Sequence, residues 1–506
     1  MTVEGSGHGT QRRKPIAFEV WLVAMGMALL ILFAIVQRML LGSAVSSYLH
    51  FLGVPLDDIY IHTRFAENLA HGFSYSFNPG QTLTADTSPL WVALLAVGGI
   101  FTSHLELVAI VISMLAYLTL GPGVYRASRD VFHLTEAHAQ IAGVATVISS
   151  RLVWSGMSGM ETALAALLAL LVVEEHIRSR QRICPRGREA IWLGLGILVR
   201  PEFMFFAVVL IADWVIMGIH QSSQWGGRKY IRTLLLLLAV IASPAFLLPL
   251  ITRNSLISHS SVVQGAHITL VPNFRYLWFA ARILASNNLI VFALLLAGIW
   301  LLRTDGNFRM LYLIALGLPI LQAFVAPQFR QSGRYFFPVI PLLIIVAVAA
   351  WERTARLPRL IPVLIMLAGL IETGRWSRIA AESVRNINDQ HLAVVSWLNA
   401  NMQPTDTLAV DDVGAIGYFL NKPVIDLTGL MTPPLWPLQH EQDSVWRAAR
   451  ARGANLFVLY RRLNPSFFAE HQDSLVLQQD FPVRLPLASA ADTTMSIYRL
   501  KGTHGS

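Results

Sequence analysis

Residues 20–36 read VWLVAMGMALLILFAIV, an unbroken apolar run that decides the fold class. A helix through this run is long enough to cross the hydrocarbon core of a membrane. A basic stretch, residues 12–14, precedes the run, and residues 37–39 after it form no small-residue cleavage site. We therefore interpret the run as a retained membrane helix rather than a signal peptide. The basic stretch predicts that residues 1–15 form a cytoplasmic tail, with the next loop on the outer face.

The whole chain shares this apolar character. Of its 506 residues, 54% are hydrophobic and 14% are charged, against about 25% charged in an ordinary soluble domain. The mean hydropathy of +0.53 is spread along the chain, which indicates a polytopic membrane protein and excludes a soluble enzyme, a disordered chain and a collagen. The single cysteine, Cys184, can form no intramolecular disulfide. The net charge of +9 comes from basic residues clustered between apolar runs, which is typical of cytoplasmic loops rather than of nucleic-acid binding.

Basic clusters and apolar stretches alternate along the next part of the chain. The clusters, which we place in the cytoplasm, lie at residues 178–188, 228–232, 303–309 and 353–359. The apolar stretches lie at residues 135–150, 159–177, 189–200, 203–219, 231–252, 288–302, 310–326, 335–351 and 360–372. A run at residues 89–101 reaches only about 20 Å and is predicted to be a juxtamembrane or re-entrant helix, whereas residues 105–125 cross. We predict about eleven membrane helices within a transmembrane domain of residues 16–372, which leaves the C-terminus outside.

From residue 373 onward the pattern changes. Alternating segments such as residues 407–411 and 455–460 predict strands. Helical patterns at residues 389–402 and 444–453 separate them, and the second pattern ends on a glycine, where helices commonly stop. Strands that alternate with helices predict a small α/β domain over residues 373–506. We expect this domain to be soluble and extracytoplasmic.

The first outer loop, residues 42–88, carries the clearest candidate chemistry. Residues 56–69 read LDDIYIHTRFAENL, so Asp57 and Asp58 open a predicted helix. One interpretation is a helix cap, because aspartate favours the positive end of a helix. The other is catalysis, in which one carboxylate takes a proton from an acceptor hydroxyl while the second orients it or binds a cation. Arg64 lies on the same helical face as Asp57, which would line one groove with a base and a phosphate-binding cation.

Further motifs occur along the rest of the chain. They are FNPG (77–80), TSPLW (87–91), WSGM (154–157), SGMETAL (158–164), LVRPE (198–202), GRYFFPVIP (333–341), DDVGAIGY (411–418) and PVIDLTGL (423–430). Together with the first-loop segment they resemble the C-type glycosyltransferase superfamily, GT-C. More narrowly, they resemble its actinobacterial arabinofuranosyltransferases of the B type and related bacterial transferases. The resemblance covers nearly the whole chain, and the first-loop signature is its most specific part.

The resemblance implies an inverting transferase that moves a sugar, such as arabinofuranose or a hexose, from a polyprenyl-phosphate carrier to an acceptor outside the membrane. By position, Asp57 and Asp58 match the acidic pair, and we take Asp57 as the base and Asp58 as its assistant. Glu161 and Arg200-Pro201-Glu202 match polar groups near the outer boundary of the membrane. The loop at residues 253–265 and Phe203, which follows Glu202, depart from the family pattern, so the donor sugar stays open.

The residues themselves support several of these candidates. Glu161, Arg200 and Glu202 are ionisable groups in or beside apolar runs, where they are costly unless they face a cavity or a partner. A purely structural ion pair among them is the alternative. Arg334 is predicted on the outer side, where a lipid phosphate arrives, and arginine suits a phosphodiester.

Two further residues are weaker candidates for binding the donor. Arg330 shares the predicted outer location of Arg334, but an arginine at a helix end also reaches lipid headgroups without any catalytic role. His259 lies in a predicted outer loop and is either a phosphate contact or an ordinary loop residue.

No cofactor is required by these residues, and no His/Cys/Asp cluster has the spacing of a structural metal site. If a divalent cation such as Mg²⁺, Mn²⁺ or Ca²⁺ acts, we expect Asp57 or Asp58 to hold it with the donor phosphate. The expected partners are membrane lipids, the lipid-linked donor, and a glycan, lipid or protein acceptor, with no nucleic acid. The expected location is the cytoplasmic membrane, with the active site and the C-terminal domain outside.

Two other classes of protein fit some of the same features. A transporter or flippase for a lipid-linked sugar would also have many helices and buried charges. A non-catalytic membrane scaffold would need the acidic pair only as a cap. The paired carboxylates in a long outer loop and the predicted α/β domain favour the transferase.

Overall fold

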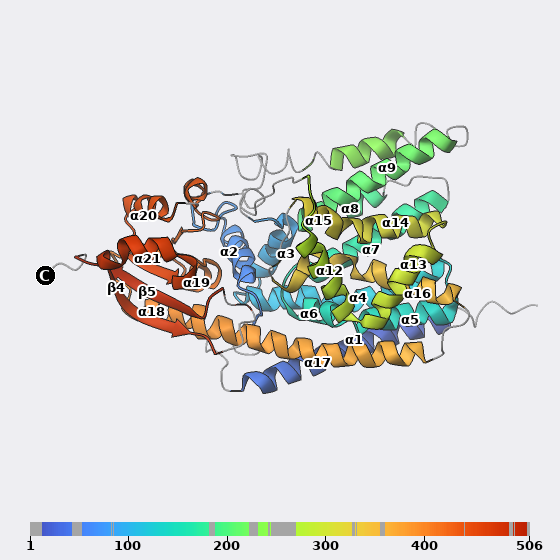
Figure 1. Cartoon of the computed structure of the whole chain (residues 1–506), viewed down its shortest axis with the longest axis horizontal. Helices are drawn as coiled ribbons and strands as arrows, with labels where there is room; N and C mark the ends of the chain where they lie inside the picture. Colours follow the sequence, from blue (N-terminus) through green and yellow to red (C-terminus); the bar gives the residue numbers. More distant parts are fainter. Residues whose placement is uncertain are drawn as a thin grey trace, which may run out of the picture.

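The computed structural model describes residues 13–42, 53–81, 83, 86–181, 188–221, 231–240, 243, 270–325, 329, 331–354, 360–439, 441–484, 489 and 491–502. Figure 1 shows an elongated molecule with a helical bundle at one end and a β-sheet at the other, near the C-terminus. The long helix α17 runs from the bundle to the sheet.

The bundle is built from helices of very different lengths. They are α1 (Arg13–Leu41), α2 (Asp58–Ala70), α3 (Pro89–Gly99), α4 (Leu105–Asp130), α5 (Glu136–Val147), α6 (Ser150–Met157), α7 (Thr162–Gln181), α8 (Arg188–Val199), α9 (Phe203–Gln221), α12 (Phe274–Asn287), α13 (Leu289–Leu301), α14 (Gly306–Ala315), α15 (Gly317–Val325), the 3₁₀ segment η1 (Gln331–Val339), α16 (Ile340–Arg353) and α17 (Ile361–Ile387).

Within the described chain, four helical segments are long and apolar enough to cross a membrane. They are Ile16–Leu41, Leu105–Asp130, Gly306–Val325 and Gly333–Arg353. Along α1, large apolar side chains such as Val20 and Ile31 are exposed, as they are where a helix faces lipid. These helices are those of an integral membrane protein, and the predicted crossing at residues 105–125 lies within one of these four candidate spans.

The predicted number of about eleven crossings is not confirmed. Helices α5 and α8 have 12 residues each, so each reaches only about 18 Å against a core of about 30 Å. Helix α3 has 11 residues, in agreement with the short helix expected at residues 89–101. Such short helices do not span the core on their own.

Close approach of backbones holds the first helices of the bundle together. A Cβ atom on Gly121 of α4 would lie 2.4 Å from Val147 of α5, and one on Gly143 would lie 2.9 Å from Leu22 of α1. Small residues at such crossings are how helices pack in lipid, because no hydrophobic effect drives association there. This packing holds α1, α4 and α5 against one another.

The C-terminal elements form an α/β arrangement, which we call the sheet unit. Its elements are the π-helical turn η2 (Asn388–Leu392), α18 (Ala393–Asn401), β1 (Leu408–Val410), α19 (Gly414–Leu420), β2 (Ile425–Asp426), η3 (Pro433–Leu438), α20 (Gln442–Ala451), β3 (Leu456–Tyr460), η4 (Arg461–Leu463), α21 (Pro465–His471), η5 (Gln472–Ser474), β4 (Leu475–Pro482) and β5 (Thr494–Leu500). The predicted strands at residues 407–411 and 455–460 and the predicted helices at residues 389–402 and 444–453 are confirmed.

The described strands form one sheet of order β2-β1-β3-β5-β4. Strands β1, β2 and β3 are parallel, while β5 runs antiparallel to β3 and β4. All five residues of β3, LFVLY, are buried, as expected for a central strand covered on both faces. The carboxyl end of β1 leads directly into Asp411 and Asp412.

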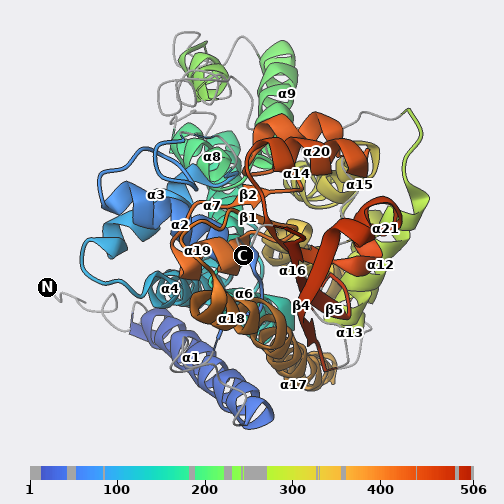
Figure 2. The same ribbon diagram turned by 90° about the vertical axis from the view of Figure 1, so that its left-hand side faces the viewer.

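Two contacts join the sheet unit to the bundle. Helix α17 continues without a break through residues 372 and 373, so the proposed domain boundary falls inside a helix rather than in a linker. Helix α2 packs on α19, where Tyr60 contacts the rings of Tyr418 and Phe419. Figure 2, which looks onto the sheet end, shows α19 beside α2. The first loop is therefore docked on the sheet unit, and this docking positions the acidic pair.

Candidate active site

Asp57 and Asp58 point to different partners although they are adjacent. The Asp58 Oδ2 atom accepts a hydrogen bond from Arg334 Nη2 at 2.6 Å. The Asp57 Oδ1 atom accepts one from the backbone N–H of Ala415 at 2.7 Å. Successive residues at a helix start are rotated by about 100°, which separates the two side chains. Asp57 occupies the N-cap position of α2 but makes no capping hydrogen bond with its side chain, so capping does not explain the pair.

Asp58 belongs to a group of charged side chains that we call the charged cluster. Its members come from α2, the loop before α3, the loop before α7, the end of α8 and η1, and they are Asp58, His62, Asp86, Glu161, Arg200, Glu202 and Arg334. Arg200 lies 3.5 Å from Glu161 and 3.2 Å from Glu202. The structure therefore brings five of the residues predicted from the sequence into one place.

Two guanidinium groups in the charged cluster have donors to spare. Arg200 and Arg334 are buried, and they flank the ring of Tyr335 with their Cζ atoms 5.1 and 5.4 Å from its centroid. Among the described residues, no hydrogen-bond partner is found for Nη1 of Arg200 or for Nε and Nη1 of Arg334. Buried N–H groups without an acceptor are costly, so these donors are suited to an anionic ligand. Asp58 beside them stays 33% exposed.

His62 and Asp86 belong to the charged cluster but were missed in the sequence. His62 Nδ1 lies 2.5 Å from Asp86 Oδ2, and its Nε2 lies 3.7 Å from Glu161 Oε2. Burial alone would lower the pKa of His62, but Asp86, Glu161 and Asp58 together raise it above its ordinary value. His62 stands four residues after Asp58 on α2, and this helical spacing is the signal that could have revealed it.

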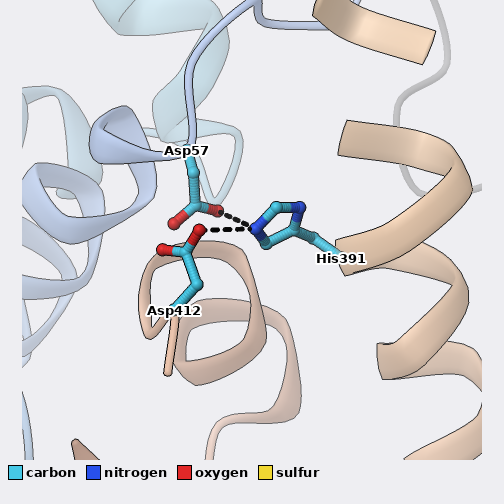
Figure 3. A group of neighbouring side chains, drawn as sticks. All are labelled: Asp57, His391 and Asp412. Carbon is cyan, nitrogen blue, oxygen red and sulfur yellow. Dashed lines mark hydrogen bonds and ion pairs between the residues drawn. The ribbon is translucent and has the colours of Figure 1, made fainter. Parts of the chain in front are cut away.

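Asp57 lies in a second group, with His391 and Asp412, which we call the junction trio. Figure 3 shows both carboxylates directed toward the Nε2 atom of His391, which is 3.9 Å from Asp57 Oδ1 and 2.9 Å from Asp412 Oδ2. The three ligand atoms lie within 4.8 Å of one another. Asp412 stands in the DDVGAIGY motif, but neither it nor His391 was predicted as a site residue from the sequence.

Each member of the junction trio has a shifted pKa. Burial and the neighbouring Asp412 raise the pKa of Asp57 well above its ordinary value. Partial burial alone would raise the pKa of Asp412, but His391 lowers it. Burial alone would lower the pKa of His391, but Asp57 and Asp412 raise it to about 9. The charge of each group therefore depends on the charges of the other two.

The metal ligands expected from the sequence were the two carboxylates of the acidic pair. The structure directs Asp57 and Asp58 to different groups, and Asp58 is paired with an arginine, which disfavours a cation beside it. Asp57, His391 and Asp412 are the residues of this region whose oxygen and nitrogen atoms could surround one divalent ion.

Gly414 provides a test of the docking between α2 and the sheet unit. A Cβ atom at this position would lie 2.0 Å from Asp57 Oδ2 and 2.6 Å from the Asp57 carbonyl oxygen. We expect Gly414→Ala to lower the free energy of unfolding by about 1–3 kcal/mol, the usual cost of overpacking. The matched control is Gly374→Ala in α17, where nothing lies within 4 Å and the change should be neutral or slightly stabilising. Thermal unfolding of both variants in detergent checks this, and equal melting temperatures would contradict it.

The other candidates have different positions. Arg64 is buried and donates to the Phe77 carbonyl, Glu67 and Asn421, so it ties the first loop to itself and to the sheet unit. The structure gives it these partners instead of a place in the charged cluster. His259 and Arg330 lie outside the described residues.

Solved structures with the same arrangement are known. ArnT from Cupriavidus metallidurans in the apo state superposes with a TM-score of 0.61 over 94% of this chain and 97% of that chain, at 13% sequence identity. The chain has the fold of the C-type glycosyltransferases. The sequence resemblance is thereby confirmed at the level of the fold.

Two other comparisons agree with the GT-C fold. ArnT from the same organism bound to undecaprenyl phosphate has a TM-score of 0.58 at 12% identity, over 96% of this chain and 99% of that chain. A mutant of the arabinofuranosyltransferase AftD from Mycobacteria has a TM-score of 0.50 at 14% identity, over 95% of this chain and 41% of that chain. Residues 384–498 match a family described as a domain of unknown function, DUF8728. No curated protein matches the sequence.

Proposed function

We propose that this protein is a membrane glycosyltransferase that moves a sugar from a polyprenyl-phosphate donor to an acceptor hydroxyl. The observation that carries the proposal is a pair of buried arginines beside a partly exposed carboxylate, Asp58. In this pair, Arg200 Nη1 and Arg334 Nη1 have no hydrogen-bond acceptor among the described residues, and Glu161 lies 3.5 Å from Arg200 Nη1. The two arginines would form an anion-binding site, and Asp58 beside them would be a base. The relative ArnT was solved with undecaprenyl phosphate, which supports a lipid-phosphate ligand of this chemistry.

In the proposed reaction, Arg200 and Arg334 bind the donor phosphate, and Asp58 takes the proton of the acceptor hydroxyl. The acceptor oxygen then forms a bond to the anomeric carbon as the bond between that carbon and the phosphate oxygen breaks. Polyprenyl phosphate leaves with the electron pair, and the arginines stabilise its charge. Attack from the face opposite the phosphate inverts the anomeric configuration.

The geometry favours Asp58 over Asp57 as the base. Asp58 touches Arg334, so a phosphate on that guanidinium would bring the donor next to it. Asp57 faces the sheet unit instead, where it accepts from the Ala415 N–H and lies 3.9 Å from His391 Nε2. Glu161, Glu202 and the His62–Asp86 pair would then position the two arginines. This replaces Asp57, the base expected from the sequence, in the proposal.

An apolar cavity supports a lipid-linked substrate. It has a volume of 720 Å³ and lies between α1 and α4, with Leu30, Ile31, Ile110 and Met157 among its lining residues. A Cβ atom on Gly159 would contact Ile110 and Ile59, so the cavity wall adjoins the start of α2 and the loop that carries Glu161. An isoprenoid or acyl chain fits such a lining.

The remaining parts of the proposal concern location. We place the protein in the cytoplasmic membrane with residues 1–15 inside, and with the charged cluster and the sheet unit outside, where the basic loops predicted from the sequence put them. The acceptor is a cell-envelope glycan, lipid or protein. The sheet unit, docked on the first loop, is positioned to contact it.

The test is donor turnover by the purified protein in detergent. We expect that one member of a panel of polyprenyl-phosphate sugars, including arabinofuranose and hexoses, loses its sugar and releases polyprenyl phosphate. The configuration of the product, determined by NMR, distinguishes inversion from retention. Donor binding across the panel without any turnover, together with donor movement across vesicles, would support a flippase instead.

A further inference from the structure

We propose that Asp57, His391 and Asp412 form a binding site for a divalent cation that joins the first loop to the sheet unit. The inference does not depend on sugar transfer, and it places the ion outside the charged cluster. It rests on the composition and geometry of the junction trio, on a buried oxygen atom to which no described N–H group donates, and on the groups that hold the ligands.

The donor set suits a transition metal. Two carboxylate oxygens and one imidazole nitrogen lie within 4.8 Å of one another, and the two carboxylates converge on the same ring nitrogen (Figure 3). A mixed set of this kind suits Zn²⁺ or Mn²⁺ better than Mg²⁺ or Ca²⁺, which prefer oxygen alone. The side chains of His391 and Asp57 are 1% and 9% exposed, while that of Asp412 is 33% exposed, so an ion can enter beside Asp412.

One oxygen atom of the trio points independently to a ligand. Asp57 Oδ2 is buried, and among the described residues no N–H group donates to it, while the neighbouring Asp412 carboxyl group can pair with it only by sharing a proton. A buried carboxylate oxygen without such a donor carries a desolvation penalty that a bound cation would remove. Gly414 leaves the space around this oxygen open, since a Cβ atom there would lie 2.0 Å from it.

The surroundings resemble the outer shell of a metal site. The Ala415 N–H orients the Asp57 carboxylate, and the Tyr460 hydroxyl lies 3.4 Å from Asp412 Oδ2. Such contacts fix the direction of metal ligands. In the described chain, no lysine or arginine forms an ion pair with Asp57 or Asp412, and the charged partner of both carboxylates is His391, itself a proposed ligand. A bound metal would displace the proton of His391, after which two carboxylates and a neutral imidazole would balance the charge of a divalent ion.

The position of the site gives the ion a mechanical role. Asp57 is the last residue before α2, whereas His391 lies in η2 and Asp412 follows β1. An ion shared by the three would clamp the beginning of α2 onto the sheet unit. Because Asp58 is the next residue, the clamp would also hold the carboxylate that contacts Arg334.

The experiment measures metal binding without any substrate. The full chain, purified in detergent with a tag that lacks histidine and treated with EDTA, is incubated with Zn²⁺ or Mn²⁺ and analysed for bound metal after gel filtration. We expect the wild type to bind one equivalent of metal per chain. We also expect the melting temperature of the EDTA-treated protein to rise when metal is added back. His391→Gln and the nearly isosteric Asp412→Asn should each weaken binding by about tenfold or more.

The chain offers a matched control in the same sheet unit. His471 lies 2.8 Å from Asp443 and 4.0 Å from Glu470 in a more exposed group of similar composition. The His471→Gln variant should still bind one equivalent of metal per chain. Should the metal be lost in His471→Gln and kept in His391→Gln, or should the wild type bind neither ion, the proposal is wrong.

A spectroscopic measurement avoids dependence on variants that fold poorly. Co²⁺ added to the metal-free wild type should give visible d–d absorption that Zn²⁺ removes, and the absence of these bands would count against the site. A chain that binds metal but transfers no sugar would contradict only the proposed function. A chain that transfers sugar but binds neither Zn²⁺ nor Mn²⁺ would contradict only this inference.

Discussion

Asp58→Asn should reduce sugar transfer by about 10²–10⁴-fold, the usual contribution of a general base. Asparagine has nearly the same size and can still accept a hydrogen bond from Arg334, which contacts Asp58 at 2.6 Å. What it loses is the ability to take the acceptor proton. The loss should therefore appear in kcat, with the KM for the donor nearly unchanged, in an assay of released polyprenyl phosphate.

Asp57→Asn is the matched comparison, because it makes the same chemical change one residue away. Its principal effect should be on metal binding and thermal stability, since Asp57 faces His391 and the Ala415 N–H. A variant Asp58→Asn that keeps full activity, alongside an Asp57→Asn variant that binds the donor and metal but transfers nothing, would return the role of base to Asp57.

Arg200→Met should lower the free energy of unfolding by about 3–5 kcal/mol. Arg200 pairs with the buried Glu161 and also with Glu202, so its removal leaves Glu161 without its closest cation. Breaking a buried ion pair by removing one partner is strongly destabilising because the remaining charge is uncompensated. Denaturant or thermal unfolding in detergent, followed by circular dichroism, measures the loss.

Two further variants test the cause of this loss. Arg378→Met removes an arginine whose side chain is 70% exposed and which pairs with Glu382 one helical turn away, so it should cost only about 0.3–0.5 kcal/mol. The double variant Arg200→Met/Glu161→Gln should be less destabilised than the two single changes predict by addition, because both charges are then gone. If Arg200→Met were as stable as the wild type, Arg200 and Glu161 would not form the buried ion pair that the structure indicates.

Most of the fold could be predicted because it depends on local patterns. An apolar run such as residues 20–36 partitions into lipid whatever its neighbours are, and the apolar segment at residues 455–460 favours a strand. The number of crossings was harder to predict, because hydropathy does not show that α5 and α8 are only 12 residues long. The change of composition at residue 373 also does not interrupt α17.

The candidate site was predictable only in part. Residue type and position in the chain singled out Glu161, Arg200 and Arg334, because charged groups near apolar runs need a partner or a ligand. Residue type and position could not reveal that His62 and Asp86 complete the charged cluster. Nor could they reveal that Arg64 donates to Phe77 and Asn421 instead of joining that cluster. Those partners depend on how the first loop folds onto the sheet unit.

The sequence by itself determined that this is a membrane chain with a C-terminal α/β arrangement and an acidic pair after the first membrane helix. Only the tertiary structure decided what each carboxylate does. Asp58 meets Arg334 276 residues away, and Asp57 meets Ala415 358 residues away. Hydropathy and helix spacing act over a few residues, whereas these contacts arise when η1 and the start of α19 pack against the start of α2. The rotation of about 100° between successive residues then sends neighbouring side chains to different sites.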